Sequence, residues 1–166
     1  MIPARNRRAA LLRRLVVWVA LAALLHFAWE VAQLPLYTLW SDPDRGRIAR
    51  YLLHCVAGDI VIAVTIYLLT AIVFRELFWP DRRPWRAGIL TVTLGLAFTV
   101  ASEWYNVSVV GSWAYAPQMP TLGGVGAAPL LQWLVVPVLM ISGVRRLDPQ
   151  PSSVAGIRAA AENHHN

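Results

Sequence analysis

The sequence predicts an all-α integral membrane protein, a bundle of four transmembrane helices with both termini on the cytoplasmic side. Of its 166 residues, 57% are hydrophobic and only 14% are charged, a balance far from that of a soluble domain. Four long apolar runs are separated by short connecting segments. Four spans use most of the chain, so we expect one domain over residues 1–146 and a disordered cytoplasmic tail over residues 147–166.

Each apolar run is taken as one span. The first, residues 15–34, has the roughly 20 residues needed to cross the hydrocarbon core. It is too long for the apolar core of a typical signal peptide, and no convincing small-residue cleavage site follows it, so we expect it to be retained. The second and third runs cover residues 51–74 and 87–110. The fourth, residues 129–144, is the shortest and has the least distinct boundaries.

The arginines predict the orientation of these spans. All 15 basic residues are arginines, and they flank the apolar runs. Five precede the first span, three lie in 41–50, four in 75–86, none in 111–128, and three follow the fourth span. By the positive-inside rule, both termini and the middle loop are cytoplasmic, and the imbalance argues against dual topology. We expect the lipid bilayer of a bacterial inner (plasma) membrane as the surroundings, and no nucleic acid as a partner, because the arginines form no stripe with interleaved aromatics.

Five ionisable side chains lie inside the apolar runs, namely His26, Glu30, His54, Asp59 and Glu103. A charged group at the centre of a membrane-inserted helix costs roughly 2.5 to 3.5 kcal/mol. Residues of this kind therefore usually face the interior of a bundle or a wet cavity, and they mark functional sites by default.

Helical spacing groups these residues. His26, Glu30 and Gln33 are spaced by four and three, so they share one face of the first span. On the second span His54 and Asp59 are five apart and share a face poorly, whereas Cys55 and Asp59 share one.

The third and fourth spans add polar residues at a similar depth. Glu103 and Asn106 are three apart on the third span, and Gln132 lies in the first turn of the fourth. With the predicted orientation, four helices place polar groups in the outer half of the bilayer. We therefore expect a polar pocket that opens toward the non-cytoplasmic side.

The segment 111–126, which contains no charge, is expected to lie above this pocket as a lid. Trp113 and Tyr115 offer aromatic surface, and three glycines precede the fourth span. Pro129 suits the first turn of a helix, whose free N–H groups could hold a carboxylate or phosphate headgroup. The alternative is a re-entrant or interfacial connector between two spans.

Glu30 and Glu103 are the candidate catalytic residues, because a buried carboxyl group can act as a general acid or base. The structural alternative is that they pair with neighbouring polar groups and hold helices together. Such contacts contribute only about 0.6 kcal/mol each, so five ionisable groups would be an inefficient means of association. The candidate ligand-binding residues are His26, His54, Asp59, Asn106, Trp113, Tyr115 and Gln132.

No metal site is predicted. The His26-x3-Glu30 pattern lacks the HExxH arrangement of zinc proteases, and two intramembrane histidines are too few for the histidine boxes of membrane desaturases. Haem ligation would require His26 and His54 at one depth. His164 and His165 are expected to belong to a solvated tail. The sequence leaves the identity of any cofactor open.

These observations predict a membrane-embedded enzyme or binding protein for an amphipathic, lipid-like small molecule. One alternative is a proton-coupled transporter or channel subunit, which would require a homo-oligomer and polar groups continuing to the cytoplasmic side. In the cytoplasmic halves of the second and third spans, the only polar residues in the sequence are threonines. The other alternative is a non-catalytic subunit of a membrane complex.

Overall fold

The computed structural model describes residues 4–149, and these are almost entirely helical. Four helices are long and apolar enough to cross a membrane, as in an integral membrane protein. They are α1 (Ala4–Gln33), α2 (Arg45–Phe74), α4 (Pro84–Glu103), which continues as the π-helical segment η3 (Trp104–Val110), and α5 (Ala127–Leu147). The shorter elements are η1 (Leu34–Leu36), η2 (Thr38–Ser41), α3 (Trp79–Arg82) and the strands β1 (Thr121–Leu122) and β2 (Val125–Gly126). The predicted tail beyond Pro149, with His164 and His165, lies outside the described residues.

The helices are longer than the apolar runs that predicted them. Helix α1 already begins at Ala4, because arginine is a good helix former and its arginine-rich start joins the helix. Helix α2 begins at Arg45, where the Asp44 side chain caps it by accepting a hydrogen bond from the Arg47 amide at 3.1 Å. Hydropathy therefore locates the apolar part of each helix but not its ends.

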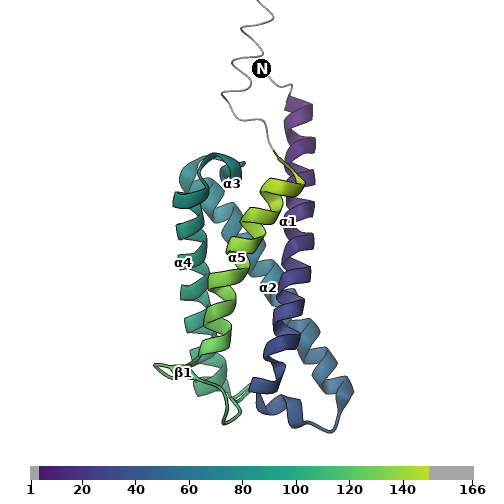
Figure 1. The fold of residues 1–166 in the computed structure, drawn as a ribbon, viewed down its shortest axis with the longest axis vertical. Helices are drawn as coiled ribbons and strands as arrows, with labels where there is room; N and C mark the ends of the chain where they lie inside the picture. The colour runs from purple at the N-terminus through teal and green to yellow at the C-terminus, as the bar shows by residue number, and fades with distance from the viewer. Residues whose placement is uncertain (1–3, 150–166) are drawn as a thin grey trace, which may run out of the picture.

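The four long helices form an irregular bundle (Figure 1). Helix α1 packs on α2 and α5, while α4 packs on α5 and less extensively on α2. The N-terminal start of α1, α3 and the C-terminal end of α5 lie at one end of the bundle, here called the α3 end. The segments 34–44 and 111–126 lie at the opposite end, here called the hairpin end. Helices α2 and α4 meet near α3 and diverge toward the hairpin end, where α2 passes behind α1.

The half of the bundle near the α3 end is filled by an aromatic core. Trp18 packs against Tyr67 with ring centroids 5.0 Å apart and against Trp79 at 5.8 Å, and all three side chains are buried. The Trp18 indole donates to the Ala63 carbonyl at 3.1 Å, so the polar atom of this ring is satisfied in the core. These three rings therefore fill the interior of the bundle in the half near the α3 end.

A close approach between α4 and α5 depends on Gly95. A Cβ atom at this position would lie 2.2 Å from Cε3 of Trp133, closer than any real contact. The missing side chain therefore makes room for the Trp133 ring, as small residues do at many membrane helix interfaces.

A buried ionic cluster joins three elements at the α3 end. The guanidinium of Arg14 is fully buried and contacts Asp81 at 2.7 Å and Asp148 at 3.0 Å. It connects α1 to α3 and to the residue that follows α5. From the sequence, Arg14 is interpreted only as one of the arginines that orient the first span, so its burial in this cluster is not predicted.

The segment 111–126 contains a short β-hairpin, which the sequence did not predict. Its strands β1 and β2 are joined by Gly123 and Gly124, which have φ angles of 59° and 85°, as a two-residue hairpin turn requires. The segment is tied to residues 36–38 by hydrogen bonds from the Ala116 amide to the Leu36 carbonyl and from the Thr38 amide to the Ala114 carbonyl. It covers the hairpin end of the bundle.

Candidate functional site

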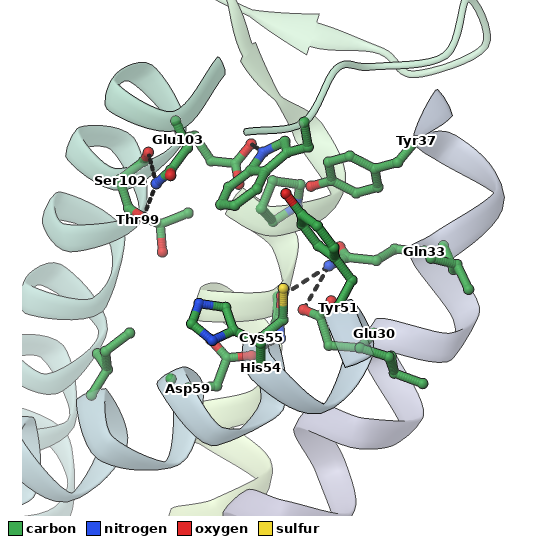
Figure 2. A pocket seen from close by; sticks show the side chains of 18 of the residues that line it. Glu30, Gln33, Tyr37, Tyr51, His54, Cys55, Asp59, Thr99, Ser102 and Glu103 are labelled. Carbon is green, nitrogen blue, oxygen red and sulfur yellow. Dashed lines mark hydrogen bonds between the residues drawn. The ribbon is translucent and has the colours of Figure 1, made fainter. Parts of the chain in front are cut away.

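A cavity of about 260 Å³ near the hairpin end is lined by residues of α1, α2, α4 and α5 and of the segments that connect them. Figure 2 shows Glu30 and Gln33 on one side, Thr99, Ser102 and Glu103 on the opposite side, and His54, Cys55 and Asp59 between them. The other lining residues are Leu34, Tyr37, Leu39, Tyr51, Leu52, Gly58, Ile62, Phe98, Asn106, Trp113, Pro129, Gln132 and Trp133. The cavity thus combines several ionisable groups with an apolar and aromatic wall.

Gln33 orients the carboxylate of Glu30. Its amide nitrogen donates to Oε1 of Glu30 at 2.7 Å and lies 3.5 Å from Oε1 of Gln132. Its own amide oxygen accepts a hydrogen bond from the Trp29 indole at 3.2 Å. The spacing of three between Glu30 and Gln33 places both side chains on one helical face, which makes this contact possible.

Gln132 joins α5 to α1 and α2. Its amide nitrogen lies 2.9 Å from Nδ1 of His26 and 3.1 Å from Oδ2 of Asp59, and these last two atoms are 3.4 Å apart. His26 is fully buried and packs its ring against Trp133 with centroids 5.2 Å apart. His26 therefore contacts Asp59 from the buried interior of the bundle and helps to hold its carboxylate in place.

Glu103 is held from the loop above it. The Tyr115 hydroxyl donates to Oε2 of Glu103 at 2.5 Å, and the Trp113 indole approaches the same oxygen at 3.5 Å. The Tyr115 oxygen also accepts a hydrogen bond from the Gly126 amide at 2.9 Å. The α-helical part of this span ends at Glu103, and seven π-helical residues follow, a feature frequent at functional sites.

The π-helical segment is also connected to α2. Asn106 donates to the Ser102 carbonyl at 2.9 Å, and its own carbonyl accepts from the Ser112 amide at 2.8 Å. The Tyr51 hydroxyl then donates to the Ser112 carbonyl. This chain of contacts fixes the loop across the gap between α2 and α4.

The cavity is strongly acidic in character. Glu30, Asp59 and Glu103 line it, whereas no arginine is among its lining residues in the described part of the chain. Burial and the neighbouring Glu103 carboxylate raise the pKa of the Tyr37 phenol and that of the Tyr115 phenol above the ordinary value for tyrosine. Both phenols therefore stay protonated at neutral pH, and the Tyr115 hydroxyl can donate to Glu103.

Seven of the nine predicted site residues line the cavity, namely Glu30, His54, Asp59, Glu103, Asn106, Trp113 and Gln132. His26 and Tyr115 do not line it and instead contact its carboxylates from behind. His54 and Asp59 both reach the cavity although they share a helical face poorly, because the open space beside α2 is wide enough to include both faces.

Six polar or thiol-bearing lining residues were not proposed as site residues, namely Gln33, Tyr37, Tyr51, Cys55, Thr99 and Ser102. A spacing signal was present for several of them. Tyr51, Cys55 and Asp59 recur every four residues on α2, and Thr99 precedes Glu103 by four on α4. Tyr37 carries no such signal, because it lies outside the long helices.

The amides at the start of α5, which the sequence suggested for an anionic headgroup, are partly bonded within the chain. The Gly126 amide donates to Tyr115, and the Ala127 amide donates to the Pro120 carbonyl at 2.8 Å. Two of the N–H groups offered to a carboxylate or phosphate headgroup are therefore already bonded inside the chain. Among residues 4–149, no three His, Cys, Asp or Glu side chains are placed to hold one metal ion.

The fold and the cavity define a class, a protein of four membrane-spanning-length helices with a carboxylate-lined cavity near one end. Comparisons with protein-family models, curated proteins and solved structures gave no match.

Proposed function

We propose that the protein is a membrane-embedded enzyme or binding protein for an amphipathic small molecule, with Glu30 and Glu103 as its proton-handling groups. One observation carries this proposal. The side chains of Glu30, Asp59 and Glu103, from three different helices, line a single cavity whose remaining wall is largely apolar. Carboxylates inside spans are costly, so their convergence on one cavity favours a functional role.

The size and position of the cavity favour an amphipathic ligand. A volume of about 260 Å³ suits a polar head with a short piece of chain. His54 and Phe98 line the cavity and are also exposed at the surface of the bundle, on α2 and α4. This exposure favours lateral entry from the hydrocarbon phase, with the apolar part of the ligand remaining among lipid chains.

The surroundings of Glu30 and Glu103 suit proton exchange. Each carboxylate has one oxygen held by a neutral donor, Gln33 in one case and Tyr115 in the other. Such donors stabilise the charged form and fix its direction without neutralising it with a cation. A ligand in the cavity would meet carboxyl groups able to accept or release a proton.

We further propose the N-in/C-in orientation, in the inner membrane of a bacterium. The α3 end carries the start of α1, the α3 region and the end of α5, where most arginines lie. The cavity, near the opposite end, then belongs to the outer half of the bilayer. A fluorescent protein fused after Asn166 should fluoresce, and alkaline phosphatase inserted between Gly123 and Gly124 should be active. The reverse pattern would contradict the orientation.

A proton-coupled transporter or channel subunit is less well supported. A relay would have to continue from Asp59 to the α3 end, yet the buried rings of Trp18, Tyr67 and Trp79 fill that part of the bundle. No feature of the described residues identifies a surface for an obligate partner chain.

Cys55 offers a direct test, because it lines the cavity and is the only cysteine in the sequence. The protein in lipid nanodiscs is treated with a maleimide after addition of dodecylammonium, dodecanol or dodecyl phosphate. We expect at least one of these probes to slow labelling of Cys55. Labelling that no probe changes, or the absence of labelling without probe, would overturn the proposal that an amphiphile enters this cavity.

The role of the carboxylates is tested with Glu30→Gln and Glu103→Gln. Both variants should lose part of the protection of Cys55, and any proton-transfer activity found for the protein. Glu76→Gln is the matched control, because it removes one carboxylate at the opposite end of the bundle. Equal protection in all four proteins would contradict a role for Glu30 and Glu103.

A further inference from the structure

We propose that the polar head of the ligand is a cation, an organic ammonium group carried on an apolar chain. This inference rests on the proposed function, since it assumes that the cavity takes an amphiphile, and it adds the charge of the head. Three features of the cavity support it. Its three carboxylates have no arginine beside them, some of its hydrogen-bonding groups have no partner among the described residues, and part of its wall is aromatic.

No arginine of the described residues lines the cavity, and the one basic partner of its carboxylates there is His26, which lies 3.4 Å from Asp59 and is a cation only when protonated. The arginines nearest in sequence to this end are already engaged outside the cavity. Arg47 pairs with Asp42 at 3.1 Å, Arg50 pairs with Asp44 at 3.5 Å, and the Arg45 guanidinium lies over the Trp40 ring. A ligand cation would supply the charge that the protein does not, which offsets the cost of carboxylates inside the bilayer.

Hydrogen-bonding groups remain open in the cavity. Glu103 and Asp59 both line the cavity, and their polar contacts involve only Oε2 of Glu103 and Oδ2 of Asp59. Oε1 of Glu103 and Oδ1 of Asp59 therefore have no hydrogen bond within residues 4–149. Both are acceptors, and an ammonium group is a donor.

Thr99 supplies an observation that is independent of the acidic residues. Its side chain lines the cavity, its exposure is only 5%, and its hydroxyl has no hydrogen-bond partner among the described residues. A buried polar group without a partner is costly, so a ligand that forms a hydrogen bond with it gains affinity.

The aromatic wall also suits a cation. The rings of Tyr37, Tyr51, Trp113 and Trp133 line the same cavity as the carboxylates. Tyr51 and Trp113 stand edge to face at 6.4 Å. Aromatic faces attract ammonium groups, most strongly when water is excluded, and aromatic cages are a common means of recognising them.

The other charge types fit less well. A phosphate or carboxylate head would be repelled by Glu30, Asp59 and Glu103, and two of the amides at the start of α5 already donate within the chain. A metal ion needs convergent ligands, which the His, Cys, Asp and Glu side chains between residues 4 and 149 do not offer. The hydrogen bonds and aromatic contacts of an ammonium group need less strict geometry than the coordination of a metal ion.

The test compares the three dodecyl probes by the bilayer concentration that gives half-maximal protection of Cys55. Measuring the partition of each probe into protein-free nanodiscs corrects for its different affinity for lipid. Dodecylammonium should protect at a concentration at least about tenfold lower than dodecanol, and dodecyl phosphate should be the weakest. Equal protection by dodecylammonium and dodecanol, or a preference for dodecyl phosphate, would overturn the cationic head while leaving amphiphile binding intact.

Two variants sharpen the comparison. Glu103→Gln should narrow the preference for dodecylammonium over dodecanol, and Thr99→Val should weaken binding of both by a similar factor. Glu76→Gln should keep the full preference. If Glu103→Gln behaves like Glu76→Gln, the carboxylate does not recognise the charge, and the proposal fails.

Discussion

The hydroxyl of Tyr115 lies 2.5 Å from Oε2 of Glu103 and also accepts a hydrogen bond from the Gly126 amide. One phenol therefore ties the loop above the cavity both to a carboxylate of α4 and to the residue that precedes α5. The position of the loop therefore depends on Glu103. The link also explains how Tyr115, which does not line the cavity, contributes to the site.

Replacing Tyr115 by Phe should loosen this loop. The variant removes the donor to Glu103 and the acceptor of the Gly126 amide, so we expect a loss of about 1 to 3 kcal/mol in unfolding free energy. Hydrogen exchange at Gly126 should become faster. Tyr105→Phe is the control, because Tyr105 is exposed on the π-helical segment. Unchanged exchange in Tyr115→Phe would contradict the link.

The Tyr115 phenol should also make the stability of the protein depend on pH in the alkaline range. Burial and the bond to Glu103 raise the pKa of Tyr115 above the value of about 10 found in unfolded chains. The stabilisation from the protonated phenol is therefore complete below about pH 10 and is lost as the pH rises through the folded-state pKa. In the folded protein, wild type and Tyr115→Phe should show the same tyrosinate absorbance near pH 10. A difference of about half a tyrosinate, which a phenol with the ordinary pKa of about 10 would give at that pH, would contradict the raised pKa.

Gly95→Ala should destabilise the packing of α4 on α5. The new Cβ would lie 2.2 Å from Trp133, so the ring must move, at a cost of about 1 to 3 kcal/mol. Gly58→Ala is the matched control, since a Cβ there meets nothing within 4 Å. Unfolding in a detergent titration, followed by circular dichroism, should separate the two. Equal stability would show that this contact is not tight.

Arg14→Met should weaken the α3 end of the bundle. It leaves Asp81 and Asp148 without their buried partner, and we expect a loss of about 3 kcal/mol. The effect is limited because Arg13 stays 2.5 Å from Asp148. Arg50→Met removes an exposed pair and should cost less than about 1 kcal/mol in the same unfolding experiment. Similar losses in both variants would contradict a buried cluster.

Some features could be predicted from the sequence because they depend on local patterns. Hydropathy located four helices, and the helical period placed Glu30 beside Gln33 and Glu103 near Asn106. The convergence of polar residues from four spans followed from matching their depths. These inferences needed no knowledge of how the helices pack.

Other features depend on contacts between distant segments. Nothing near Arg14 shows that Asp81 and Asp148 will meet it, so a buried cluster looked like part of an orienting arginine run. The contact of Tyr115 with Glu103 depends on the path of a nonhelical loop. Thr99 resembled any membrane threonine until the divergence of α2 and α4 placed it beside a cavity.

The most direct test of the central claim is photolabelling of the protein in nanodiscs with a dodecylammonium probe that carries a diazirine beside the nitrogen. Peptide mass spectrometry should find the label within residues 51–62 and 98–106, and excess dodecylammonium should prevent it. Ile72 and Val73, exposed on α2 near the other end, report nonspecific contact from lipid. Labelling that favours Ile72 and Val73, or that excess dodecylammonium does not reduce, would contradict a ligand in the carboxylate-lined cavity.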